Sequence, residues 1–203
     1  MILKKFSCGP FATNVYLLVC TQTRSGVFVD PAPDSYADLT KAAKDCEMKA
    51  IFLTHSHWDH MADTKKLKDF FSIPVYVHQR DSFNLSCPGS DGLPLFMPIE
   101  GVQSDCDLVD GQILTIGHLQ ICVIHTPGHT PGGVCFYIKK EKALLSGDTL
   151  FKGAIGNLSF PTANADAMWQ SLRTLNQLPE DTCIYPGHGP FTTIGAERAL
   201  LLR

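Results

Sequence analysis

Short apolar segments of strand length recur along the chain and are separated by polar or turn-forming residues. Such runs, bounded by Gly, Pro, Asn or Asp, are typical of buried β-strands. The opening stretch "MILKKFSCGPFATNVYLLVC" is interrupted by Gly9 and Pro10, which predicts a pair of strands joined by a turn. Further along, the pattern predicts strands at Val15–Val19, Val27–Val29, Ile51–Leu53, Val75–Val77, Ile113–Ile116, Ile121–Ile124, Val134–Ile138, Ala143–Leu145 and Cys183–Tyr185.

Helical periodicity occurs in three segments between these strands, at Ser35–Cys46, Met61–Phe71 and Asn164–Gln177. The third segment opens on Asn164, a residue type that favours the N-cap position. Its apolar residues Met168, Leu172 and Leu175 follow the spacing i, i+4, i+7. Such a stripe indicates a surface that packs on the core rather than a cofactor site.

The order of these segments describes two strand-rich halves, each closed by helices. A segment rich in Pro, Gly, Ser and Asp, Asn84–Asp105, has the composition of a loop and is too short to form a domain. Because sheets and helices must bury their apolar faces against one another, we expect two stacked sheets covered by helices. Residues 1–203 are predicted to form one domain.

Composition and charge narrow the class of protein. Of the 203 residues, 44% are hydrophobic and 18% are charged, which is a globular rather than a disordered balance. No apolar run is long enough to span a membrane, and the net charge of -3 gives no basic field for nucleic acid or anionic lipid. The eight cysteines are scattered without a C-x-x-C pair, which is typical of reduced thiols and predicts a cytoplasmic location.

The stretch "THSHWDH" places three histidines and one aspartate directly after the apolar run Ala50–Leu53. Imidazole and carboxylate groups are ligands of zinc and related divalent ions, and a strand end is a rigid base for them. His55 and His57 lie two positions apart and would face one side of an extended backbone, whereas Asp59 and His60 would turn toward a second position. The density of ligands indicates a metal site rather than a polar surface loop.

Three more candidates follow apolar strands further along the chain. They are His129 in "TPGHTPGG", Asp148 in "LLSGDTLF" and His188 in "IYPGHGP". Each alone is an ordinary turn or loop residue, but loops at strand ends converge on one edge of a sheet sandwich. The remaining histidines, His78, His118 and His125, have no neighbouring ligand cluster and are expected to be structural or surface residues.

The motifs "THSHWDH", "TPGHT", "GDTLF" and "PGHG", in this order, resemble the metallo-β-lactamase superfamily and are most similar to its glyoxalase II-like hydrolases. The similarity extends to "TNVYLL", "VFVDPAPD" and "GPFTTIGAER" and so spans nearly the whole chain. It implies an α+β fold, the αββα sandwich. It also implies one ion bound by His55, His57 and His129, a second bound by Asp59, His60 and His188, and Asp148 as the bridge between them.

A dinuclear centre of this kind implies hydrolysis. Zinc is the expected metal, although iron and manganese accept the same ligands. A divalent ion lowers the pKa of bound water from about 15.7 to about 7, and a second ion about 3.5–4 Å away polarises a carbonyl. Metal-bound hydroxide would then attack a thioester such as S-D-lactoylglutathione, with Asp59 orienting the hydroxide as ligand or base. An aspartate at the bridging position, where many β-lactamases of this fold have cysteine, argues against antibiotic hydrolysis.

Two other hypotheses remain open. A mononuclear iron persulfide dioxygenase shares the resemblance and would use His55, His129 and Asp148. A metal-binding structural or regulatory module would need a site closed to substrate, whereas glycines flank both His129 and His188. A nuclease of this fold is disfavoured because the chain is acidic and has no long basic arm. The sequence gives no indication of the oligomeric state.

The chain departs from the glyoxalase II-like pattern after "GDTLF". Many bacterial members continue with a segment similar to "IGRTDLP", whereas this chain has Asn157 in place of the arginine and Ser159 in place of the aspartate. Larger members also carry a carboxy-terminal helical domain that contributes to glutathione binding, and here Pro190–Arg203 follows the last motif. We therefore expect inefficient hydrolysis of S-D-lactoylglutathione, with a high KM and tolerance of other thioesters.

Overall fold

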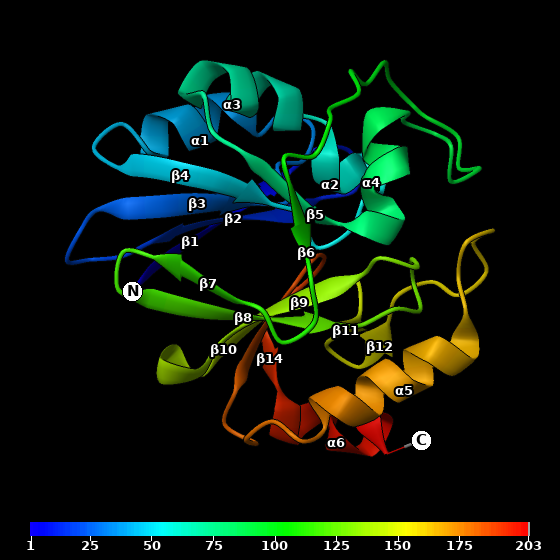
Figure 1. Cartoon of the computed structure of the whole chain (residues 1–203). Coiled ribbons are helices and arrows are strands. Elements are labelled where there is room, and N and C mark those ends of the chain that lie inside the picture. The colour runs from blue at the N-terminus through cyan, green and yellow to red at the C-terminus, as the bar shows by residue number, and fades with distance from the viewer. Residues whose placement is uncertain (203) are drawn as a thin grey trace.

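Two β-sheets face each other, and helices cover the outer face of each, in the computed structural model (Figure 1), which describes residues 1–202. The first six-stranded sheet contains, in spatial order, β1 (Ile2–Cys8), β2 (Thr13–Val19), β3 (Ser25–Val29), β4 (Glu47–Phe52), β5 (Val75–His78) and β6 (Cys106–Leu108). The second contains β14 (Thr192–Thr193), β13 (Cys183–Pro186), β10 (Ala143–Gly147), β9 (Val134–Ile138), β8 (Leu119–His125) and β7 (Ile113–Ile116). The predicted α+β class and αββα sandwich are confirmed.

The helices divide between the two outer faces (Figure 1). The first half of the chain contributes α1 (Tyr36–Ala42), α2 (Trp58–Met61), α3 (Thr64–Phe71) and α4 (Gln79–Ser86). The second half contributes a 3₁₀ turn (Lys139–Glu141), a small hairpin of β11 (Leu150–Phe151) and β12 (Ala154–Ile155), then α5 (Ala165–Leu175) and α6 (Ile194–Leu201). No helix among residues 1–202 is long and apolar enough to cross a membrane.

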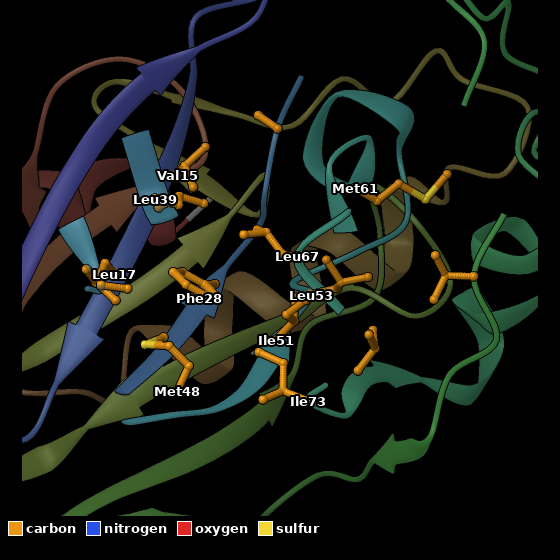
Figure 2. Packing of buried hydrophobic residues seen from close by; sticks show 14 of the residues in the cluster. Val15, Leu17, Phe28, Leu39, Met48, Ile51, Leu53, Met61, Leu67 and Ile73 are labelled. Atoms are coloured by element: carbon orange, nitrogen blue, oxygen red, sulfur yellow. The ribbon is translucent and has the colours of Figure 1, made fainter. Parts of the chain in front are cut away.

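The central strands β2 and β3 of the first sheet are buried along their whole length because both faces of the sheet are covered there. In β2, Val15 and Leu17 pack in the cluster shared with the helices (Figure 2), whereas Tyr16 and Leu18 between them point into the cluster between the sheets. The same alternation explains why sequence patterns along these strands are continuous rather than amphipathic. On the far side, the Met168 stripe of α5 is fully buried against the second sheet, as predicted.

All strands predicted from apolar runs occur, and two of them, Ile113–Ile116 and Val134–Ile138, have the predicted bounds. The predicted cap of α5 is also confirmed, because the Asn164 side chain accepts a hydrogen bond from the Ala167 backbone N at 2.9 Å. The first predicted helix is shorter than expected and ends at Ala42. The predicted helix Met61–Phe71 is two helices, α2 and α3, separated by residues 62–63.

Several elements were not predicted. The strands β6, β11, β12 and β14 have only two or three residues, which is too short for a periodic signal. Helix α4 follows β5 without an intervening turn, because the His78 side chain caps it by accepting from the Arg80 backbone N. Its last turn occupies the start of the segment predicted as a loop, Asn84–Asp105. Leu53 was expected to end a strand but lies one residue beyond β4.

Candidate metal centre

Loops and one short helix at the ends of strands carry the predicted site residues. His55 and His57 lie between β4 and α2, and α2 itself contains Asp59 and His60. The other three residues occupy loops of the second sheet: His129 follows β8, Asp148 follows β10 and His188 follows β13. Strands β10 and β13 are parallel neighbours, so their following loops emerge at the same edge of the sheet.

Three histidines form a first group. The ring nitrogens of His55, His57 and His129 that could act as ligands lie within 4.8 Å of one another, and all three residues are buried. Their rings meet edge to face, with centroid distances of 4.5 Å between His57 and His129 and 4.7 Å between His55 and His57. This arrangement leaves a space bounded by three imidazole nitrogens.

A second group lies beside the first. Asp59, His60 and His188 offer ligand atoms within 4.8 Å of one another. The Asp59 Oδ2 atom is 3.3 Å from His188 Nε2 and 3.5 Å from His60 Nε2. Asp148 lies between the groups, because one oxygen, Oδ2, is 3.5 Å from His129 Nε2 while the other, Oδ1, is 3.3 Å from His60 Nε2. The structure thus brings all the predicted residues to one place.

Several ligand-type atoms at this centre are buried without a hydrogen-bond partner among residues 1–202. They are the Nε2 atoms of His55, His57 and His129, and Oδ1 of Asp148. Buried polar atoms in proteins are nearly always paired, so a cluster of orphans facing one space fits a bound cation. The residues present therefore suit divalent metal ions, whose preferred ligands are imidazole nitrogen and carboxylate oxygen.

Protonation in the first group suits metal binding. Burial lowers the pKa of His55 well below its usual value, and the neighbouring His60 charge lowers it further. Burial, together with His129, lowers the pKa of His57 to about 3. Both imidazoles are therefore neutral at physiological pH, which is the form that coordinates a metal.

The carboxylates of the centre are ionised. Burial alone would raise the pKa of Asp148, but the adjacent His60 and His188 lower it below its usual value. Asp59 shows the same balance, and its pKa also ends below the usual value. His60 responds in the opposite sense: burial opposes its protonation, but Asp148 and Asp59 raise its pKa well above the usual value. A cation that binds beside His60 would displace this proton.

Asp30, which sequence reasoning did not select, orients the first motif from behind. Its carboxylate accepts hydrogen bonds from the Thr54 backbone N at 2.7 Å and the Thr54 hydroxyl at 2.6 Å. The Oδ2 atom that accepts from the Thr54 hydroxyl also contacts His60 Nδ1 at 3.0 Å, which leaves Nε2 directed at the centre. Carboxylate partners of this kind fix the ring orientation of a ligating histidine.

Asp81 braces two of the loops against each other and was also missed. Its carboxylate accepts from the Ser56 backbone N at 3.0 Å, the Thr130 hydroxyl at 2.9 Å and the Gly132 backbone N at 2.6 Å. Burial raises the pKa of Asp81, although these hydrogen bonds favour the ionised form. The loop of His55 and His57 is thereby tied to the loop of His129.

The start of β2 ties the second group to the first sheet. The Thr13 hydroxyl donates to Asp59 Oδ2 at 2.9 Å. The Asn14 side-chain amide donates to the carbonyl oxygens of Pro186 and Gly189, which flank His188, at 2.9 Å each. The sequence carries one signal for this role: Thr13 and Asn14 are polar residues that open a strand whose other residues are apolar.

Two of the remaining histidines, His78 and His125, contact each other and belong to none of the ligand groups, which fits the structural role expected for them. The rings of His78 and His125 stack with centroids 4.1 Å apart and an interplanar angle of 5°. His78 ends β5 and His125 ends β8, so this pair links the two sheets away from the metal centre. Burial, together with His125, lowers the pKa of His78 to about 4.

A cleft of about 630 Å³ opens over the centre. His57, Asp59, His129, Asp148 and His188 are among the residues that line it, and most of the others are apolar. The cleft leads from solvent to both groups of ligand-type side chains. A small molecule can therefore reach the centre.

An αββα sandwich with a buried His/Asp centre below an open cleft is typical of metal-dependent hydrolases. The chain belongs to the Metallo-beta-lactamase superfamily, whose sequence pattern matches residues 8–188. It is 31% identical to the probable metallo-hydrolase YqgX of Bacillus subtilis, over 96% of this chain and 93% of that protein. It is also 30% identical to the hydroxyacylglutathione hydrolase GloC of Haemophilus influenzae, over 89% of this chain and 88% of that protein.

Two solved structures match over nearly their whole length. The B3 metallo-beta-lactamase BLEG-1 has a TM-score of 0.89 and 35% identity, covering 98% of this chain and 97% of that one. TTHA1623 in a di-iron-bound form has a TM-score of 0.81 and 32% identity, covering 96% of each chain. TTHA1623, a similar chain, thus holds two iron ions. BLEG-1 is described as a β-lactamase, so an aspartate at position 148 is a weaker argument against β-lactam hydrolysis than the sequence suggested.

Proposed function

We propose that this protein is a dinuclear metal-dependent hydrolase of acyl thioesters. The observation that carries the proposal is the pair of ligand groups joined by Asp148. In this assignment His55, His57 and His129 hold one ion, Asp59, His60 and His188 hold the second, and Asp148 contacts both. The unpaired buried atoms of the first group support the assignment. Zinc is our first choice of metal, and the di-iron form of TTHA1623 keeps iron open.

When bound, a pair of divalent ions supplies an acidified water and a positively charged contact for a carbonyl oxygen. The protein's own residues position the reactants. Asp59, held ionised and fixed by the Thr13 hydroxyl, would orient this water as ligand or as base. No Ser, Thr, Cys or Lys lies among the described residues that line the cleft, so a covalent intermediate on a hydroxyl, thiol or amine side chain is not expected.

The choice of a thioester rests on the similarity to GloC, which is described as a hydroxyacylglutathione hydrolase. S-D-lactoylglutathione is the reference substrate, with inefficient turnover and a high KM. The segment that departs from the glyoxalase II-like pattern lies at the cleft. Its Asn157 side chain accepts a hydrogen bond from the Ser159 backbone N at 2.8 Å and thus closes a turn, where the arginine and aspartate of the pattern would supply an ion pair or a substrate contact.

Metal analysis and a thioester assay on the same protein test the proposal. Metal-replete protein should contain about two divalent ions per chain and hydrolyse acyl thioesters. Asp148→Ala should lose both ions, whereas His188→Ala should retain the first and bind the second weakly. Equal loss of both ions from His188→Ala would contradict the partition into two groups.

Two further assays on this preparation separate the competing chemistries. Oxygen consumption with glutathione persulfide, together with a single iron per chain, would identify the dioxygenase. Hydrolysis of a β-lactam without any thioesterase activity would place the protein with enzymes such as BLEG-1. Two retained ions without turnover on any of these substrates would favour a structural or regulatory module. We expect a small molecule as the partner rather than nucleic acid or a membrane, given the net charge of -3.

A further inference from the structure

Aromatic side chains from three separate segments form one wall of the cleft. Phe11 comes from the turn between β1 and β2, Trp58 from α2, and Phe96 from the segment between α4 and β6. Their ring centroids are 5.1 Å apart for Phe11 and Trp58, 5.7 Å for Trp58 and Phe96, and 6.0 Å for Phe11 and Phe96. We call these three residues the aromatic wall.

The aromatic wall is open to solvent at its outer edge. Phe96 is 68% exposed and Phe11 is 50% exposed, whereas Trp58 beneath them is only 3% exposed. Large apolar side chains that gather at the mouth of a site, rather than singly over the surface, indicate a surface that binds a ligand. Trp58 directly precedes Asp59, so the wall is continuous with the metal centre.

Two more aromatic residues of the cleft lining, Phe160 and Phe151, lie beside the ligand-type histidines. The Phe160 ring lies 5.4 Å from the His57 ring, edge to face, and 5.5 Å from the His129 ring. Phe151, at the end of β11, lies 6.1 Å from His188. Aromatic rings therefore lie beside both groups of ligand-type residues, and a substrate at the centre contacts apolar surface there.

No lysine or arginine lies among the cleft-lining residues within 1–202. Glutathione carries two carboxylates and one ammonium at neutral pH, and a carboxylate taken out of water needs a cationic or hydrogen-bonding partner. Beyond the ligand-type residues, Asn157 is the one polar residue of this described lining, and its side-chain oxygen already accepts from Ser159. Arg80 lines an adjacent cavity of about 110 Å³, which shares His57 with the cleft and also contains Asp81 and Asp91.

Resting on the proposed thioesterase activity, we propose that the aromatic wall is the specificity-determining surface. The substrate class that it selects is a thioester with an apolar acyl group on a small uncharged thiol. Each methylene of an acyl chain that packs against the wall leaves water, which corresponds to about a fourfold gain in kcat/KM. A charged tripeptide carrier meets no countercharge in the cleft and gains nothing from the wall.

Kinetics with the metal-replete full-length chain test this inference. The probes are acetyl, butyryl and hexanoyl thioesters of N-acetylcysteamine, which is uncharged, and the same acyl groups on glutathione. We expect kcat/KM to rise with acyl length by about fourfold per methylene until the cleft is filled. For one acyl group, the uncharged carrier should exceed glutathione by at least about tenfold, the order expected for an unpaired carboxylate.

Phe96→Ala should reduce the ratio of hexanoyl to acetyl turnover by about tenfold or more, since it removes the exposed part of the wall. Phe70→Ala is the matched control, because Phe70 is a 61% exposed phenylalanine on α3 that does not line the cleft. It should leave the ratio unchanged. An unchanged ratio in Phe96→Ala, accompanied by a change from dimer to monomer in sedimentation, would overturn the inference and assign the wall to a second copy of the chain.

The inference would also be overturned if kcat/KM were higher for the glutathione thioesters than for the N-acetylcysteamine thioesters and this preference disappeared in Arg80→Ala. Calorimetry with S-hexyl-N-acetylcysteamine, a thioether that cannot be hydrolysed, measures binding to the aromatic wall without any turnover. It therefore distinguishes a failure of this inference from a failure of the proposed thioesterase activity. Binding of this thioether that is lost in Phe96→Ala but retained in Phe70→Ala supports the wall even if no thioester is turned over. Absence of binding in the parent protein contradicts it.

Discussion

Single buried carboxylates behind the ligand-type residues give the candidate centre its shape. Asp30 serves Thr54 and His60 at once, and it does so from a left-handed backbone conformation with φ of 52°. Left-handed conformations are uncommon for residues other than glycine, and Asp and Asn tolerate them best. Position 30 therefore requires a residue that tolerates a positive φ and that also accepts hydrogen bonds from Thr54 and His60. Few residue types satisfy both requirements.

Asp30→Asn should preserve the backbone and weaken the second metal site. The amide has one acceptor oxygen in place of two. With its NH2 at the Oδ2 position, the Thr54 hydroxyl and His60 Nδ1 both lose their acceptor, and with its NH2 at the Oδ1 position the Thr54 backbone N loses its acceptor. In either orientation the negative charge beside His60 is lost. We expect metal affinity at the second site to fall by about 10–100-fold, measured by competition with a chelator of known affinity. Asp45→Ala, an exposed aspartate elsewhere, is the control and should bind metal as the parent does. Equal affinity in Asp30→Asn and the parent would remove Asp30 from the site.

The stacked pair of His78 and His125 makes stability sensitive to acid. The pKa of His78 falls to about 4 in the folded chain, against about 6.5 when unfolded, so the unfolded chain binds the proton more readily. Acid therefore favours unfolding as pH falls from about 6.5 to about 4. His78→Asn keeps an N-cap acceptor for α4 and removes this titration. Urea titrations should therefore show that the difference in unfolding free energy between the parent and His78→Asn becomes smaller as pH falls from 7.5 to 5, because only the parent is destabilised by acid through His78. A difference that stays constant over this range would contradict the lowered pKa of His78.

At the scale of elements, α5 and the His129 loop are packed so closely that one position between them excludes a side chain. Gly128 has φ of 152°, and a Cβ placed there would lie 2.5 Å from the Met168 Cα atom. The Gly128 carbonyl also accepts from the Asn164 backbone N at 2.7 Å, just before α5 begins. The helix thus holds the loop that presents His129.

Gly128→Ala should destabilise the protein and displace His129. Backbone strain and overpacking together predict a loss of about 2–6 kcal/mol in unfolding free energy. Gly111→Ala is the matched control, because Gly111 has φ of 74° but open space around it, so only the backbone cost of about 1–2 kcal/mol applies. Urea unfolding and metal content measure both effects. Similar losses in the two variants would show that the contact with Met168 is unimportant.

Elements were predictable from sequence where the local signal was strong. Val134–Ile138 is an apolar run between Gly133 and Lys139, and its bounds were predicted correctly. Helix α6 lacks such a signal, since Gly195 interrupts its first turn and it packs with α5, a contact set by the tertiary fold. The braces of the centre were equally hidden: Asp81 joins Ser56 to Gly132, and nothing local in the sequence marks partners so far apart.

For the whole molecule, metal binding and folding are linked. The centre draws on both sheets, and its unpaired buried groups favour the folded state only when cations are present. Metal at a thousandfold excess over its Kd contributes about 4 kcal/mol, which for a chain of this size corresponds to a rise in Tm of roughly 10 °C.

Chelation should therefore lower Tm by about that amount in a thermal scan, and repletion should restore it. Asp148→Ala provides the comparison, because a chain that cannot hold the pair should show a much smaller shift. A parent protein that is stripped of metal by elemental analysis yet melts at the same temperature would show that the centre does not contribute to stability.

The segment that carries Phe96 has a consequence for how this protein changes over generations. Within the described chain, residues 94–99 make no hydrogen bond, and the anchors of the segment lie at its ends, where Asn84 binds the Asp91 backbone and Asp105 binds Val75. The candidate ligands lie elsewhere and have their own supports in Asp30 and Asp81. Mutations in residues 94–99 can therefore alter which molecules are accepted while the reactive centre is inherited intact, so descendants can acquire new substrates without passing through an inactive ancestor.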